Sequence, residues 1–243
     1  MQWRAETFTD GQDTLVAMQT ALERNLEELA SPLGSALRPI WRGRTHMFAF
    51  LGAVPAFVVL IVLARGASAT TGAAIYGAGV TGMFGVSATY HRLVHSLRAR
   101  AAWQRADHAT IYAAIAGSCT PICLVAMPSP WGVTMLVLVW VGAAFGMLIK
   151  ALAWRHAEVV GGVLYLVLGW AGMGALPSMW QRNGVWPAVC LIAGGVLYTI
   201  GAIGFALGRP RLRPSVFGYH EVWHLFTIAA ATTQLVGIWA VVT

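Results

Sequence analysis

Five residues of this sequence have types and spacings that could do chemistry, and three of them are histidines. His220 and His224 are four residues apart, so on a helix their imidazoles share one face. Ser87 and His91 have the same spacing, and Asp107 follows them after a basic stretch. Zinc favours histidine nitrogen, and three protein ligands with an open fourth position are typical of a catalytic zinc. These residues form a site only if the elements that carry them bring them together.

The composition indicates that those elements lie in a membrane. Hydrophobic residues make up 58% of the 243-residue chain, and charged residues make up only 10%. A soluble globular domain carries about 25% charged residues, so an ordinary cytosolic enzyme is excluded. The net charge of +7 does not indicate nucleic acid as a partner, because the arginines are spread between apolar runs and form no single patch. The surface is therefore expected to face membrane lipids.

Uncharged runs predict an all-α polytopic membrane protein with a bundle of seven transmembrane helices. A transmembrane helix needs about 20 apolar residues. The uncharged stretch 109–149 is too long for one span, and Pro128 and Pro130 divide it. The predicted spans are 47–64, 66–90, 109–126, 131–149, 159–180, 186–208 and 217–242.

The basic residues of the short loops predict the orientation of these spans. Twelve lysines and arginines lie on one side, and only Arg65 and Arg182 lie on the other. Cytoplasmic loops carry the excess of Lys and Arg, so the N-terminus is expected in the cytoplasm and the C-terminus outside. The span that ends with Ser87 and His91 then stops at the cytoplasmic surface.

The same orientation brings the other candidate residues to that depth. Asp107 opens the next predicted span, and His220 and His224 lie in the first turns of the last one. Ionisable residues inside a membrane are costly and indicate function by default. We therefore predict a zinc ion held by His91, His220 and His224. Asp107 would hold the water on the zinc, and Ser87 would add a hydroxyl.

The histidines of this predicted zinc site also have two simpler interpretations. Interfacial histidines can merely cap helices or contact lipid headgroups. Of the other histidines, His46, His95 and His156 lie at loop edges and are expected to be interfacial, whereas His108 could orient Asp107.

Glu221 also has two interpretations. The string His220-Glu221-Val222-Trp223-His224 matches the His-Glu-x-x-His pattern, in which Glu221 would be a general base. However, Glu221 points about 100° around the helix from His220. It is expected instead to pair with an arginine of residues 209–213 or to favour the helix N-terminus.

The first 40 residues form a separate cytoplasmic segment, and 41–243 form the membrane domain. Apolar residues recur at spacings of three and four and predict a short amphipathic helix. They are Leu15, Met18, Leu22, Leu26 and Leu29. This helix would pack on the bundle or lie at the membrane interface; alternatively, it would dock a partner or a second copy.

Three spaced motifs resemble those of the hemolysin III family, the bacterial branch of the progestin and adipoQ receptors, which include the adiponectin receptors. The motifs are Ser87-Ala88-Thr89-Tyr90-His91, Asp107-His108 and His220-Glu221-Val222-Trp223-His224. The resemblance implies a seven-helix protein of the bacterial cell membrane with a zinc near the cytoplasmic face. It implies His91, His220 and His224 as ligands, with Asp107 on the water and Ser87 close by. The wider superfamily includes alkaline ceramidases, which implies hydrolysis of lipid amides.

Three function classes follow from these observations. The first is a zinc-dependent membrane hydrolase in which Asp107 acts as general base and Ser87 helps to stabilise the oxyanion. The second is a non-catalytic lipid receptor or sensor with a structural zinc. The third is a hemolysin-like cytolytic protein. Each expects a lipid or lipid-like molecule as its substrate or ligand.

Overall fold

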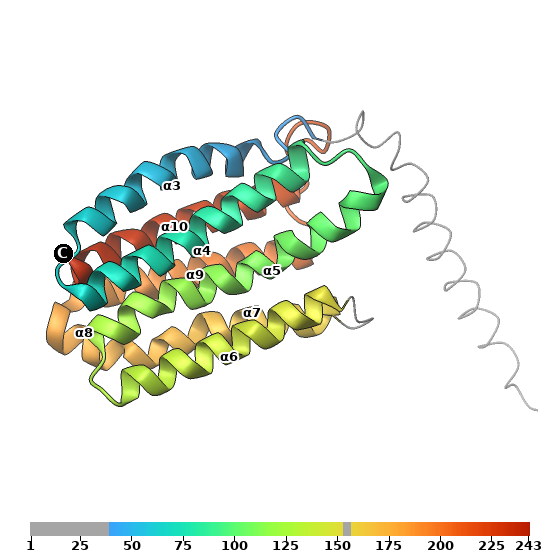
Figure 1. Ribbon diagram of the computed structural model, residues 1–243. Helices are drawn as coiled ribbons and strands as arrows, with labels where there is room; N and C mark the ends of the chain where they lie inside the picture. Colours follow the sequence, from blue (N-terminus) through green and yellow to red (C-terminus); the bar gives the residue numbers. More distant parts are fainter. Residues whose placement is uncertain (1–38, 153–156) are drawn as a thin grey trace, which may run out of the picture. The chain divides into compact units, whose positions relative to one another are not determined.

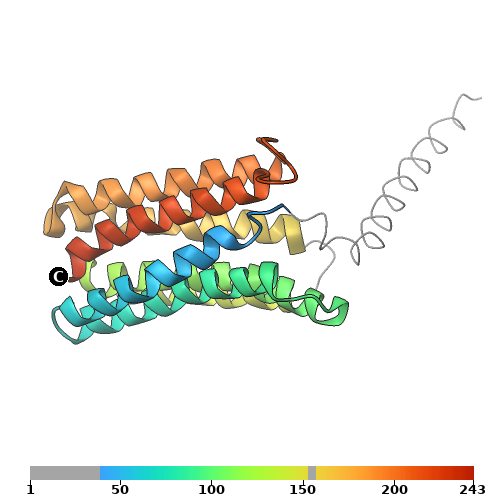
Figure 2. The ribbon, with the colours of Figure 1, turned by 90° about the horizontal axis from the view of Figure 1, so that it is seen from above.

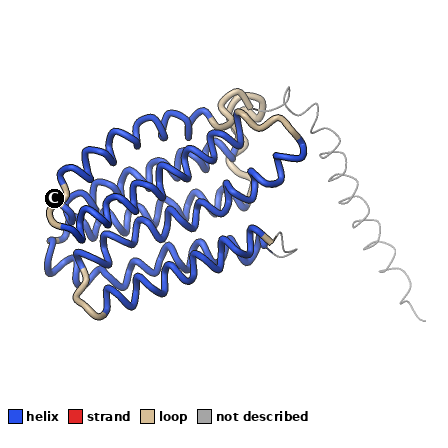
Figure 3. Tube along the Cα trace, viewed as in Figure 1, coloured by secondary structure: helices blue, strands red, loops and turns tan. Residues whose placement is uncertain are grey.

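The structure is a computed structural model that describes residues 39–152 and 157–243. Within these ranges the chain is helical apart from short turns and one isolated bridge between Arg213 and Phe217 (Figure 3). The prediction of an all-α fold is confirmed. The predicted amphipathic helix lies outside the described residues.

Seven long helical segments run side by side in alternating directions (Figures 1 and 2). They are α3 (Arg44–Leu63), α4 (Ala67–Arg92), α5 (Leu97–Pro121) with the π-helix η1 (Ile122–Ala126), α6 (Trp131–Ala151), α7 (Ala157–Ala171) with the 3₁₀ turn η2 (Gly172–Ala175) and α8 (Leu176–Asn183), α9 (Val185–Ala206) and α10 (Tyr219–Val242). The seven-helix prediction is confirmed, and the chain is a polytopic membrane bundle.

Six of these segments are long and apolar enough to cross a membrane. They are Arg44–Leu63, Ala99–Ala126, Trp131–Ala151, Val159–Asn183, Val185–Ala206 and Tyr219–Val242. The helix that falls outside this set is α4, although its 26 residues exceed the length of a span. It is rich in Gly, Ser and Thr, which have low hydropathy, and in Ala, whose side chain is small.

The small residues of α4 serve close packing against its neighbour α5. A Cβ atom added to Gly72 would lie 2.7 Å from the Cα of Pro121. One added to Gly79 would lie 2.7 Å from the carbonyl oxygen of Ala113. Small residues at such contacts let two membrane helices approach closely. The low hydropathy of α4 therefore reflects burial among helices rather than an exposed position.

The start of α5 differs from the sequence prediction. The uncharged run suggested that the helix begins near Ala109 and that Asp107 opens it, but α5 begins at Leu97. Hydropathy marks only the part of a helix that can face lipid. The Leu, Arg and Ala residues before Asp107 are good helix formers, so the helix extends beyond that part. Asp107 consequently lies three turns inside a helix, on a rigid backbone.

The loops of the bundle gather at two ends. Residues 39–43, 93–96 and 207–218 lie at one end, which we call the basic end because Arg42, Arg92 and Arg209 belong to it. Residues 64–66, 127–130 and the C-terminus lie at the opposite end (Figure 1). We propose that the basic end faces the cytoplasm, because cytoplasmic loops carry the excess of Lys and Arg.

A labelling experiment tests this orientation. A cysteine introduced at the exposed Ser96 should be shielded from a membrane-impermeant thiol reagent in intact cells, and one appended after Thr243 should react. The natural cysteines Cys119, Cys123 and Cys190 are buried, so they should give little background. Labelling of the Ser96 position alone would reverse the orientation.

Candidate metal centre

Three imidazoles meet at the basic end. His91 comes from the last turn of α4, and His220 and His224 come from the first turns of α10. One nitrogen of each ring lies within 4.8 Å of one nitrogen of each of the others. The Nε2 atoms of His91 and His220 are 3.2 Å apart. This cluster could hold a metal ion.

The spacing of the nitrogens suits a tetrahedral metal. Two ligands at the usual zinc–nitrogen distance of about 2.0–2.1 Å are about 3.3 Å apart in tetrahedral geometry. The 3.2 Å separation of His91 and His220 matches this value. The ring centroids of His220 and His224 are 4.6 Å apart, as expected for residues one helical turn apart.

Asp107 and Ser87 lie beside this cluster. The Oδ2 atom of Asp107 is 3.8 Å from Nε2 of His91, which is longer than a hydrogen bond. The hydroxyl of Ser87, which is buried, makes a side-chain hydrogen bond with the Asp107 carboxylate. The five candidate residues therefore come together from three helices, α4, α5 and α10.

A glycine lets the turn before α3 press against His91. Gly43 has a positive φ of 74°, which favours glycine. A Cβ atom added there would lie 2.7 Å from the Cβ of His91. The same turn pairs with the loop before α10, because the N–H groups of Ile40 and Trp41 donate to the carbonyls of Ser215 and Val216.

Glu221 holds the start of α10 against the turn before α3. Its side chain is completely buried and forms an ion pair with Nε of Arg42. Its second oxygen accepts a hydrogen bond of 2.7 Å from the backbone N–H of Gly218, which caps the N-terminus of α10. The partner is Arg42 and not an arginine of residues 209–213, so that alternative was wrong. The other alternative, that Glu221 favours the helix N-terminus, is confirmed. Because both carboxylate oxygens are engaged, the geometry favours a structural role over the role of general base.

The sequence prediction for His46 was also wrong. Its side chain is only 4% exposed and does not lie at the interface. It stacks face to face on His224, with ring centroids 3.7 Å apart and an interplanar angle of 13°. Position at a loop edge misled the prediction, because the burial of His46 comes from its contacts with α4 and α10.

The remaining described histidines, His95 and His108, make no ring contact with the three candidate ligands, although His108 interacts electrostatically with Asp107 and His220. His95 is exposed, and His156 is outside the described residues. The backbone carbonyl of His108 accepts a hydrogen bond of 2.7 Å from the hydroxyl of Tyr165. This bond ties α7 to α5 next to Asp107.

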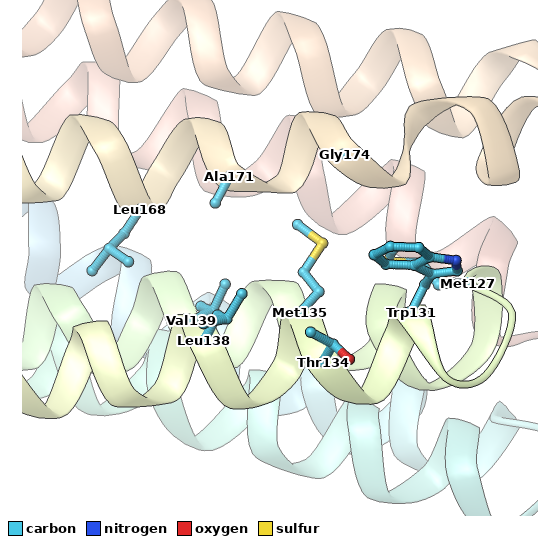
Figure 4. A pocket seen from close by; sticks show the side chains of 9 residues that line it. All are labelled: Met127, Trp131, Thr134, Met135, Leu138, Val139, Leu168, Ala171 and Gly174. Atoms are coloured by element: carbon cyan, nitrogen blue, oxygen red, sulfur yellow. The ribbon is translucent and has the colours of Figure 1, made fainter.

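An apolar groove lies elsewhere in the bundle, between α6 and the segment from α7 to η2 (Figure 4). Its lining is Met127, Trp131, Thr134, Met135, Leu138, Val139, Leu168, Ala171 and Gly174. None of these side chains titrates, and the groove starts at the loop 127–130, at the end opposite the histidines. The lining of this groove therefore contains no histidine, cysteine or charged side chain that could take part in acid–base catalysis.

Comparison with known proteins identifies the family. The model of the haemolysin-III related family matches residues 35–235, which include all five candidate residues. The chain belongs to the haemolysin-III related family. Hemolysin-3 of Bacillus cereus is 28% identical over 190 residues, covering 77% of this chain and 84% of that protein. The Hemolysin-3 homolog of Bacillus subtilis (strain 168) is 26% identical over 193 residues, covering 78% and 87%.

A human protein is similar to the chain to the same degree. Monocyte to macrophage differentiation factor of Homo sapiens is 27% identical over 199 residues, covering 80% of each chain. The matches therefore extend over most of each protein, and not over one motif.

The Arg42–Glu221 ion pair can be tested by stability. Arg42→Ala should leave a fully buried carboxylate without its cation, and a hydrogen bond to a charged group contributes about 1.5–3 kcal/mol. We expect a lower melting temperature in detergent, measured by thermal unfolding. Arg211→Ala is the matched control, because it removes the same charge from an exposed position at the same end. Equal melting temperatures for the two variants would contradict the structural role of the pair.

Proposed function

We propose that this haemolysin-III related protein is a zinc-dependent membrane hydrolase that cleaves lipid amide bonds near the cytoplasmic face. The observation that carries the proposal is the meeting of His91, His220 and His224 with the Asp107 carboxylate, 3.8 Å from His91. Structural zinc sites are usually closed by four protein ligands, whereas catalytic sites have three and an open position.

The donor set supports zinc as the metal. Imidazole nitrogen suits zinc, and hard cations such as magnesium and calcium prefer oxygen ligands. His91, His220 and His224 would hold the ion. Zinc in such a site makes water acidic enough to ionise near neutral pH and polarises a carbonyl oxygen.

Asp107 and Ser87 would handle the proton and the substrate. Asp107 is close enough to the cluster to accept a proton from an attacking water through a hydrogen bond. The Ser87 hydroxyl donates its single proton to that carboxylate and so orients it. To stabilise a developing oxyanion, the hydroxyl would have to turn from Asp107 to the substrate. Both side chains are mounted on helix backbones, so little reorganisation is needed during the reaction.

Lipids are the expected substrates because of where the cluster lies. It sits at the end of helices whose outer faces are apolar and exposed, for example at Phe48, Leu51 and Val58 of α3. A lipid in the bilayer would reach the cluster with its polar linkage at the depth of the headgroups. The resemblance to the superfamily that contains alkaline ceramidases favours an amide as that linkage.

A lipid receptor with a structural zinc is the second candidate. It is favoured by the position of the cluster, since a metal there would link the end of α4 to the start of α10. In that case Asp107 would be needed for shape and not for turnover.

Metal content tests the ligand set. We expect purified protein to contain about one zinc per chain, with the zinc lost in His220→Ala and His224→Ala and weakened in His91→Ala. The reason is that each change removes one of the three nitrogens. His95→Ala removes an exposed histidine and should keep its zinc. Full zinc occupancy in the double variant of His220 and His224, measured by elemental analysis, would refute the site.

Asp107→Asn separates the hydrolase from the receptor. The change is nearly isosteric and leaves three histidines, so zinc should stay bound. Hydrolysis of a fluorescent ceramide by the purified protein should fall by about 10²–10⁴, the usual contribution of a general base. Loss of zinc would instead make Asp107 a direct ligand of a closed site and favour the receptor. Unchanged turnover with zinc retained would remove Asp107 from the mechanism.

A further inference from the structure

His46 is a buried titratable residue that the proposed mechanism does not use. It lies in the first turn of α3, and neither ring nitrogen has a hydrogen-bond partner among the described residues. Its closest ring contact is the stack on His224, at 3.7 Å and 13°. A second ring, that of Phe84 from α4, packs against it at 5.0 Å and 57°. The His46 ring is therefore packed between Phe84 of α4 and His224 of α10.

His224 needs something to fix the plane of its ring. A metal-ligating histidine almost always donates its second ring N–H to an acceptor, which sets the orientation of the imidazole. Nδ1 of His224 is buried and has no hydrogen-bond partner in the described part of the chain. Its other ring neighbours, His91 and His220, are themselves candidate ligands. Among the ring contacts of His224 with described residues, the one from outside the ligand set is the His46 ring.

The stacking geometry also shows that His46 is not a fourth ligand of the same kind. The lone pair of a ring nitrogen lies in the plane of the ring. Two nearly parallel rings with centroids 3.7 Å apart cannot both point a lone pair at one ion about 2.0–2.1 Å away.

We infer that His46 is a positioning residue, which holds the His224 imidazole by face-to-face stacking in the plane that metal binding requires. This inference rests on the proposed function only in that the cluster binds zinc. Phe84 backs the His46 ring, and the turn before α3 is fastened to α10 by Arg42 and Glu221.

Two variants separate the ring of His46 from its nitrogens. His46→Phe keeps an aromatic face and removes both nitrogens, whereas His46→Gln keeps polar atoms and removes the ring. Zinc affinity is measured on the full chain in detergent by competition with a chelator. His46→Gln should weaken binding about 10–100-fold, the usual effect of losing a partner that orients a ligand. His46→Phe should stay within about threefold of the original chain.

Cobalt gives a second readout. In the Co²⁺-loaded protein the d–d absorption band reports the coordination geometry, so His46→Gln should change the band and His46→Phe should preserve it. Phe57→Ala is the matched control, since it removes a buried ring from α3 that packs on Tyr76 and touches no histidine of the cluster. Its zinc affinity should not change.

The outcomes distinguish this inference from the proposed function. Wild-type affinity in His46→Gln, or equal losses in His46→Gln and His46→Phe, would overturn the stacking role and leave the zinc site standing. A wild-type chain that binds no zinc would overturn both. Should His46→Phe fail to fold, His46→Gln with an unchanged affinity and cobalt spectrum would still overturn the inference.

Discussion

The ion pair between Arg42 and Glu221 joins the turn before the first described helix to the last helix, across 179 residues of sequence. A carboxylate with no exposed surface must find its partner inside the protein, because an unpaired charge there is strongly destabilising. This requirement brings the turn before α3 against the start of α10. The contacts of Gly43 with His91 and of His46 with His224 both depend on that approach.

The other half of the centre depends on α4. Its glycines allow α5 to come so close that Ser87 and His91 face Asp107. An α4 with larger apolar side chains would be more stable in contact with lipid. Those side chains would, however, keep α5 at a greater distance. The long helix that falls outside the set of apolar spans is thus the one that positions two of the five candidate residues.

Local sequence patterns predicted those features that depend on neighbouring residues alone, namely the helices and the residues one helical turn apart. Uncharged runs marked the seven helices, and the four-residue spacings placed His220 beside His224 and Ser87 beside His91. The start of α5 was missed because loss of hydropathy does not end a helix. The partner of Glu221 and the burial of His46 were missed because both arise from contacts between distant segments, and no spacing along the chain encodes such contacts.

The order of the helices along the chain has a consequence for biosynthesis. His91 and Asp107 enter the membrane with the early helices, whereas His220 and His224 arrive with the last. Until α10 is inserted, the early helices present a lone imidazole, a carboxylate and the uncovered ring of His46 to the lipid boundary. The nascent bundle must therefore be sheltered, or stay loosely packed, until its final helix docks. A metal held by His91, His220 and His224, as we propose, would be bound only after membrane insertion is complete.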